Sequence, residues 1–522
     1  MLDGSGAGKS ASYVIPNACQ QLGSYVFTDP KGELYDQTAG FLREKGYKIK
    51  VLNLVRPEKS DGYNPLHHIR NQIDVDIIAN TIVKGQKDAA SSSDPFWDDM
   101  AEMLLKSLIY YLREVRPPEE QNLASCAELV RAANNNGGDN LLSNLINQLP
   151  HQHPARTNYR SIEVSSDKTY GSILSSLQSK LGKFDSKAIA ELTSTNTIDF
   201  EEIGKEKTAL YVISSDTHAA YDFLLTIFFS QMIQRLYDFA DECGGELPVQ
   251  TFFILDEFAN IGKIPDFDKK ISTSRSRKIS FSVILQNLDQ LEAVYKESHE
   301  TILGNCDTHV FLGSNSQKTV EYFSKALGEK TIYRESESIN KDRNDWKQGK
   351  SVSEQNMARA LLTPDELRRL DVDQCIIYEK GLKPIRAQKY YYFNHPTEKQ
   401  IRPFRVDHND REVTDRGKWR TYNPYNPYEE KRETAEPTKI ESLDDLFADD
   451  EPKKEEAPKE EKNNNNVQPI LDLSSLDMPP ELPMEPVGEP KVEPQTTQEK
   501  LDLQKEMEAK FDELFGTLND ID

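Results

Sequence analysis

Apolar residues near the start of the chain are grouped in short runs, and an amphipathic segment separates the first two runs. The run over 23–28 has the length and the apolar character of a strand, and 48–54 is expected to be the next strand. Between them, helical spacing over 34–45 predicts a helix that ends at Gly46, because glycine commonly follows the last residue of a helix. Strand, helix and strand in this order indicate an α/β fold with a parallel-type sheet.

This alternation stops between about residues 71 and 195. Aliphatic and aromatic residues recur there at helical spacing, for example over 96–112, and no convincing strand interrupts them. We predict an all-α insertion domain, and we interpret its stripe of Met and aromatic side chains as core packing.

The α/β pattern resumes after the insertion. A long apolar helix is predicted over 219–239, and the polar stretch 335–354 is expected to form a loop. Five further strands are predicted at 208–213, 249–255, 279–285, 309–312 and 374–378.

The charge of the chain is unevenly distributed. Of the net charge of −23 over 522 residues, −15 belongs to residues 431–522, which carry 26 acidic and 11 basic side chains. An acidic, proline-rich segment of this kind cannot bury enough apolar surface to fold alone. We therefore expect a polar, then acidic, disordered tail over 396–522. Two similar motifs in it, 443–447 and 511–515, are either docking peptides or an incidental similarity.

Several classes of protein are disfavoured by composition. No apolar run approaches the ~18–20 residues of a membrane-spanning helix, and no secretory signal precedes the glycine loop that follows Met1. The five cysteines are scattered without metal-type spacing, which indicates reduced thiols, and the histidines show no ligand spacing. This chain alone is therefore expected to be soluble and cytoplasmic.

A phosphate loop is predicted at the N-terminus. Its residues are Gly4, Ser5, Gly6, Ala7, Gly8, Lys9 and Ser10. Backbone N–H groups of such a loop cradle the β-phosphate of ATP, Lys9 would reach the β- and γ-oxygens, and the Ser10 hydroxyl would bind Mg²⁺. The strict pattern has glycine at the position of Asp3, where Gly4 and Gly6 can supply the turn instead. A chance glycine-rich turn is the alternative.

A second element is the carboxylate pair that follows the predicted strand 249–255. Ligands of open α/β sheets bind at the carboxyl ends of the strands. There Asp256 would hold Mg²⁺ through water, and Glu257 would activate the attacking water as general base. The alternative is a strand followed by an acidic turn.

Two further residues are candidates for catalysis. Gln286 ends the strand over 279–285, a position that senses the γ-phosphate in RecA-like ATPases; otherwise it is a strand-capping amide. Arg275 lies in a basic stretch, 274–278, and is either an arginine finger for a neighbouring subunit or part of a solvated patch.

Together these residues resemble the type IV coupling proteins of conjugative DNA transfer, the TraG/TraD group, over about residues 1–395. Thr28-Asp-Pro-Lys-Gly-Glu33 is the most discriminating motif, since most phosphate-loop ATPases lack it. The resemblance also rests on the phosphate loop and on Asn64-Pro-Leu66, Phe96-Trp97, Asn196-Thr-Ile-Asp199, Leu255-Asp-Glu-Phe258 and Leu285-Gln286. No role follows from the sequence for Asp29, Lys31 and Glu33 beyond their place at the end of a strand.

The resemblance implies a RecA-like P-loop ATPase domain in two parts, 1–70 and 196–395, with the all-α insertion domain over 71–195 and the tail over 396–522. It implies homo-hexameric rings that couple hydrolysis of ATP with Mg²⁺ to delivery of relaxase-bound single-stranded DNA into a type IV secretion channel. It places Arg275 at the position of a trans-acting arginine.

Family members begin with transmembrane helices and a strand, which put them at the cytoplasmic face of the plasma membrane. This chain begins just before the phosphate loop, and Met1-Leu2 is too short to form that strand, so an N-terminally truncated chain that lacks its membrane anchor is expected. Two alternative functions remain open. One is a coupling ATPase for protein effectors, and the other is a non-hydrolysing adaptor that recruits substrates.

Overall fold

The computed structural model describes residues 1–3, 8–85, 95–133, 140–215, 221–340, 349–413 and 415–424. Gly4, Ser5, Gly6 and Ala7 of the expected phosphate loop lie outside the described residues, as does the acidic tail with both of its motifs. Within the described ranges, no helix combines the length and the apolar character that crossing a bilayer requires.

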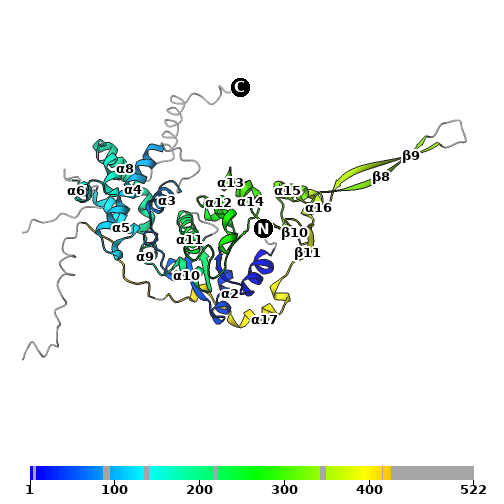
Figure 1. Ribbon diagram of the computed structural model, residues 1–522, viewed down its shortest axis with the longest axis horizontal. Helices are drawn as coiled ribbons and strands as arrows, with labels where there is room; N and C mark the ends of the chain where they lie inside the picture. The colour runs from blue at the N-terminus through cyan, green and yellow to red at the C-terminus, as the bar shows by residue number, and fades with distance from the viewer. Residues whose placement is uncertain are drawn as a thin grey trace, which may run out of the picture. The chain divides into compact units, whose positions relative to one another are not determined.

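Five parallel strands form the sheet that positions the candidate site (Figure 1). Their order is β3-β4-β2-β5-β6, and every neighbouring pair is parallel. All residues of β2 and β4 are buried, as expected for central strands covered on both faces. The predicted α/β fold with a parallel-type sheet is confirmed. The strands are β2 (Ser24–Thr28), β3 (Lys48–Asn53), β4 (Thr208–Ile213), β5 (Thr251–Leu255) and β6 (Ile279–Val283).

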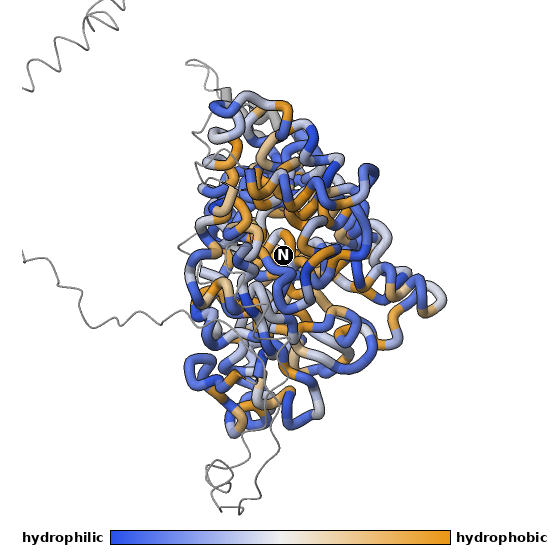
Figure 2. The backbone as a smooth tube through the Cα atoms, turned by 90° about the vertical axis from the view of Figure 1, so that its left-hand side faces the viewer, coloured by the Kyte–Doolittle hydropathy of each residue, from blue (hydrophilic) through white to orange (hydrophobic). Residues whose placement is uncertain are grey.

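Alternate residues of the central strands pack into two apolar cores. Tyr25 and Phe27 of β2 stack with ring centroids 5.5 Å apart and share a core with α2 (Glu33–Glu44). Val26 faces the other way, into a core that includes the long helix α11 (Asp222–Glu242) and the helices that follow β3. Figure 2 colours the backbone by hydropathy and shows apolar stretches interleaved with polar ones along the chain.

A second sheet is built around the first residues of the chain. The two-residue strand β1 (Leu2–Asp3) pairs parallel with β7 (Thr308–Gly313), which continues antiparallel into β10 (Gln374–Glu379) and β11 (Ile385–Gln388). On its other side Leu2 bridges to Leu285, and the Met1 amino group donates a 2.7 Å hydrogen bond to the Val283 carbonyl. The expectation that Met1-Leu2 cannot form a strand was therefore wrong, because pairing on both sides stabilises even this short segment.

Helices alone occupy the described part of the insertion. The 21-residue helix α4 packs against α3, α5, α7 and α8, and its Trp97, Met100 and Met103 lie against the apolar core. The stripe is therefore core packing, whereas the domain boundaries at 70 and 195 stay a prediction. These helices are α3 (Gln72–Lys84), α4 (Pro95–Val115), α5 (Leu123–Ala133), α6 (Leu141–Asn147), α7 (Pro154–Glu163), α8 (Asp167–Leu181) and α9 (Lys187–Ser194).

Of the stretch expected to be a polar loop, residues 335–340 and 349–354 belong instead to a two-stranded antiparallel ribbon, and residues 341–348 lie outside the described residues. Strand β8 (Glu329–Asn340) pairs along its whole length with β9 (Gly349–Ala360) (Figure 1). Almost all side chains described in it are exposed or half-buried on both faces. Polarity is therefore compatible with a strand here, because neither face joins a core.

The C-terminal part of the chain packs further than the sequence indicates. After the short helix α17 (Thr397–Ile401), residues 402–424 form what we call the strap. The Val406 N–H donates to the Asp36 carbonyl of α2 at 3.0 Å. Further along, the Tyr422 N–H donates to the Ser125 hydroxyl of α5 at 2.9 Å. Packing thus extends beyond residue 395, through these polar contacts and through a few scattered apolar side chains such as Phe404 and Val406, which lie against the core.

Candidate active site

The candidate site lies where the carboxyl ends of neighbouring strands meet. β2 and β5 are adjacent in the sheet, and the Thr28 hydroxyl donates to the Asp256 carbonyl at 2.7 Å. The Phe258 N–H donates to the Ile284 carbonyl at 3.1 Å, which ties the end of β5 to the segment after β6. Residues that follow three different strands are therefore held at one edge, as expected for ligand sites of open α/β sheets.

Lys9 connects the phosphate loop to the carboxylate pair. Its ammonium group lies 2.9 Å from Asp256 Oδ1 and 2.6 Å from Glu257 Oε1. Burial lowers the pKa of Lys9, but the two carboxylates outweigh this effect and hold that pKa above its ordinary value. Burial also raises the pKa of Asp256, and the charge of Lys9 offsets only part of this increase. Phosphate oxygens would compete with these carboxylates for the same ammonium group.

Glu257 is held in a strained and well-defined position. Its φ of 51° is in the left-handed region, which costs a non-glycine residue about 1–2 kcal/mol. Its N–H donates to Asp256 Oδ1 at 2.9 Å, and the Gln286 amide donates to its two oxygens at 3.1 and 3.0 Å. The geometry thus brings together the carboxylate proposed as base and the amide proposed as sensor.

These side chains line one cavity of about 480 Å³, within the range of ~300–1,000 Å³ typical of small-molecule sites. The hydroxyl and carboxylate oxygens of Ser10 and Asp256 are the ligands that Mg²⁺ prefers. Sequence reasoning missed Asn260 and Gln290, which also line it; the Gln290 side-chain oxygen accepts the Gln286 N–H at 3.1 Å. No sequence motif marks either residue.

The motif at the end of β2 borders the same cavity. Asp29 is buried, and its carboxylate accepts the Tyr35 N–H at 2.8 Å in the first turn of α2. Gly32 permits the turn with a φ of +76°, and the exposed Lys31 and Glu33 line the cavity. The structure therefore gives Asp29 a capping role that orients the start of α2 toward the cavity.

Asp29 provides a prediction for the pH dependence of stability. Burial raises the pKa of Asp29 to about 6, against the opposing hydrogen bonds from the Tyr35 and Leu34 backbone. Because the folded state binds this proton more tightly than the unfolded state, the free energy of unfolding should fall as pH rises from about 4 to 6 and change no further above that. The Asp29→Asn variant should lack this contribution, of the order of 3 kcal/mol. Chemical denaturation of both proteins across this range tests it, and parallel stability curves would contradict it.

Arg275 lies apart from this cavity. It is in the short turn η7 (Arg275–Arg277) before β6, hence at the amino edge of the sheet. It is exposed, and among the described residues its side chain has no hydrogen bond or ion pair. Its neighbour Arg277 pairs with Asp241 at 3.0 Å and lies over the Tyr237 ring. A role of Arg275 in the site of its own chain is not supported, and a role in a neighbouring subunit stays a prediction.

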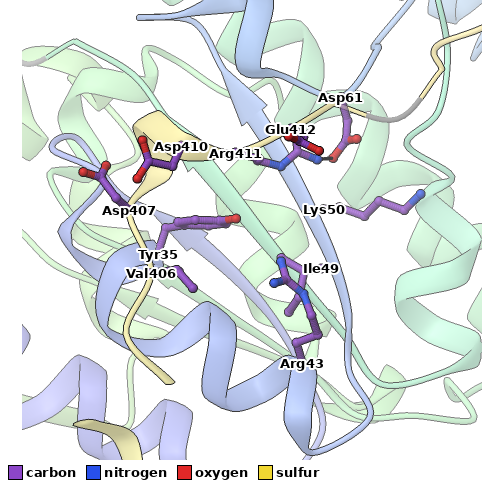
Figure 3. A pocket seen from close by; sticks show the side chains of 10 residues that line it. All are labelled: Tyr35, Arg43, Ile49, Lys50, Asp61, Val406, Asp407, Asp410, Arg411 and Glu412. Carbon is purple, nitrogen blue, oxygen red and sulfur yellow. Dashed lines mark hydrogen bonds and ion pairs between the residues drawn. The ribbon is translucent and has the colours of Figure 1, made fainter. Parts of the chain in front are cut away.

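A larger cavity of about 620 Å³ lies between the strap, α2 and the edge strand β3 (Figure 3). It is lined by side chains of both charges, and its most buried pair, Arg411 and Asp61, is joined by a 2.8 Å ion pair. It contains no residue of the phosphate loop and neither carboxylate that follows β5. We therefore place the chemistry in the smaller cavity.

Comparisons with known proteins agree with this geometry. The model of the family described as type IV secretory system conjugative DNA transfer matches residues 1–416. Protein VirD4 of Rhizobium radiobacter is 25% identical over 419 residues, covering 76% of this chain and 57% of that protein. Conjugal transfer protein TraG of Escherichia coli is 25% identical over 427 residues, covering 75% of this chain and 66% of that protein. The chain thus spans less than two thirds of the length of these curated relatives.

Solved structures share the fold. The bacterial conjugative coupling protein TrwBdeltaN70 superposes with a TM-score of 0.54 at 16% identity, covering 74% of this chain and 83% of that one. The plasmid coupling protein TrwB in complex with ADP and Mg²⁺ gives a TM-score of 0.53 at 16% identity, covering 75% and 84%. At this identity the likeness establishes the fold and no more.

Proposed function

Because this chain belongs to the conjugative DNA transfer family of type IV secretory systems, we propose that it is an ATP-driven coupling protein. It would deliver relaxase-bound single-stranded DNA to a type IV secretion channel. The observation that carries the proposal is the convergence of Lys9, Asp256, Glu257 and Gln286 in one cavity.

In the proposed mechanism, residues 4–8 would cradle the phosphates of ATP through their backbone N–H groups. Ser10 and Asp256 would hold Mg²⁺, which would neutralise charge on the phosphates. Lys9 moves from the carboxylates to the β- and γ-oxygens. This movement would free Glu257, whose carboxylate takes a proton from the attacking water as the water oxygen bonds to the γ-phosphorus. The bond between the γ-phosphorus and the oxygen that bridges it to the β-phosphorus breaks, and phosphate and ADP leave.

Gln286 links this step to the rest of the molecule. Its amide contacts both oxygens of Glu257, and its own N–H is held by Gln290 of α13 (Leu288–Tyr295). A change in the position of Glu257 on hydrolysis would therefore alter the hydrogen bonds of the segment that follows β6. This is the contact through which we infer that the nucleotide state reaches substrate-facing elements.

The proposed partners follow from family membership. They are single-stranded DNA, a relaxase, components of the secretion channel and five further copies of this chain in a homo-hexamer. The proposed place of action is the cytoplasmic face of the plasma membrane.

Two measurements test the function. Purified protein should hydrolyse ATP only with Mg²⁺, and faster when single-stranded DNA is added. Donor cells that lack the gene should regain conjugative DNA transfer when it is supplied. Absence of hydrolysis with and without DNA would favour a recruiting adaptor, and hydrolysis accompanied by transfer of proteins but not DNA would favour an effector-exporting ATPase.

A further inference from the structure

Besides the cavity that holds Lys9 and Glu257, which we call the first cavity, another one of about 350 Å³ lies beside the helix that follows the phosphate loop. We call it the second cavity. Ser12 and Pro16 belong to the wall formed by η1 (Ser10–Val14) and α1 (Ile15–Cys19). The opposite wall comes from the segment after β11, through Tyr390, Thr397 and Gln400. Nothing in the proposed hydrolysis mechanism uses these residues.

Both walls of this second cavity adjoin the end of the phosphate loop. The Ser12 N–H and hydroxyl both donate to the Gly8 carbonyl, at 2.8 and 2.9 Å. Gly8 has a φ of +81°, and a Cβ atom there would lie only 2.9 Å from the ring of Tyr391. Glycine is required here because the backbone is left-handed and because a side chain would clash with Tyr391. The Tyr390–Tyr391 segment therefore packs directly on the loop.

The two cavities differ in chemistry. The first holds the carboxylates and Gln286, whereas the second offers an aromatic ring and neutral polar groups. The two ends of a nucleoside triphosphate differ in the same way, because the γ-phosphate at one end is charged and the base at the other end is a flat, neutral ring. Since the proposed function fixes the γ-phosphate beside Glu257, the base must leave the loop away from that cavity.

Tyr390 is preorganised to receive a flat ring. The imidazole of His395 stacks on it with a centroid distance of 3.7 Å and an interplanar angle of 5°. Its hydroxyl lies 3.3 Å from the Thr397 hydroxyl, and the residue remains 44% exposed. An aromatic ring that is fixed on one side and accessible elsewhere is a stacking surface for a base.

Gln400 supplies a group that can distinguish bases. Among the described residues its side-chain amide has no hydrogen-bond partner, although it lines the cavity. A glutamine amide presents a donor and an acceptor in the arrangement that matches the N6 and N7 edge of adenine. Guanine presents two acceptors at the same edge, which one amide cannot satisfy equally.

We propose that this second cavity is the base subsite of the nucleotide site, where Tyr390 stacks on adenine and Gln400 hydrogen-bonds its edge. The proposal rests on the proposed ATPase function. It assigns to the segment after the last strand a direct part in selecting the nucleotide.

The test compares MgATP with magnesium tripolyphosphate, which has the phosphates but no base, by calorimetry on the whole chain. Tyr390→Ala should weaken ATP binding roughly ten- to hundredfold and leave tripolyphosphate binding unchanged. Tyr390→Phe keeps the ring and should recover most of the lost affinity. Tyr333→Ala, an equal truncation on the exposed ribbon strand β8, is the matched control.

Gln400→Ala gives an independent readout, because an exposed side chain without a partner can be removed with little effect on folding. It should reduce the preference for ATP over GTP. Equal losses of ATP and tripolyphosphate affinity in Tyr390→Ala would show that the ring only supports the loop and would overturn the base subsite, as would no loss at all. If the parent protein binds neither ligand, the proposed function itself fails.

Discussion

Glu257→Gln should lower ATP turnover by about 10²–10⁴-fold and leave nucleotide binding intact. The amide has the shape of the carboxylate and can still accept hydrogen bonds from Lys9 and Gln286, so the site should keep its geometry. It cannot accept a proton from water. The loss should therefore appear in turnover and not in affinity.

Lys9→Ala should have the complementary effect and abolish binding. It removes the ammonium group proposed for the β- and γ-oxygens, and it leaves Asp256 and Glu257 without their shared countercharge. Single-turnover hydrolysis and equilibrium binding of a labelled nucleotide separate the two defects. Thermal midpoints should accompany both measurements, because an unpaired carboxylate pair also lowers stability.

The matched control is Glu300→Gln in α14 (His299–Gly304), an exposed glutamate that does not line the cavity. Its turnover should equal that of the parent protein. If Glu257→Gln hydrolysed ATP at the parental rate as well, the assignment of Glu257 as general base would be wrong.

The features that the sequence predicts well are those determined by local pattern. The central strands β2 and β4 are buried along their whole length, so they read as apolar runs, and strands β2 to β6 were all expected near their observed positions. The convergence of Lys9, Asp256, Glu257 and Gln286 was also predictable, because carboxyl ends of parallel strands meet at one edge of a sheet.

The features that were missed depend on partners far away in sequence. The strap is held by contacts such as Arg411 with Asp61, which are 350 residues apart and leave no periodic pattern. The capping role of Asp29 and the two-sided pairing of Leu2 likewise become visible only when distant segments are placed. The ribbon β8–β9 escaped prediction because its exposed faces lack the apolar alternation of a half-buried strand.

Arg275 carries the second large prediction, which depends on assembly. Arg275→Ala should lower hydrolysis by about 10³-fold or more, as removal of an arginine finger does in other phosphoryl-transfer sites. Since Arg275 lies at the amino edge of the sheet, opposite the cavity of its own chain, any such effect must arise at the site of a neighbouring subunit. Hydrolysis should then also depend on protein concentration.

Mixing two inactive variants tests this directly. In a ring of Arg275→Ala and Lys9→Ala subunits at equal amounts, roughly a quarter of the interfaces combine an intact phosphate loop with an intact arginine. Activity should therefore recover to a substantial fraction of the parental rate, far above that of either variant alone. Arg277→Ala is the matched control: Arg277 pairs with Asp241, so the change should lower the thermal midpoint slightly and spare hydrolysis. If differently tagged subunits co-purify and yet no mixing ratio restores activity, Arg275 does not act across the interface.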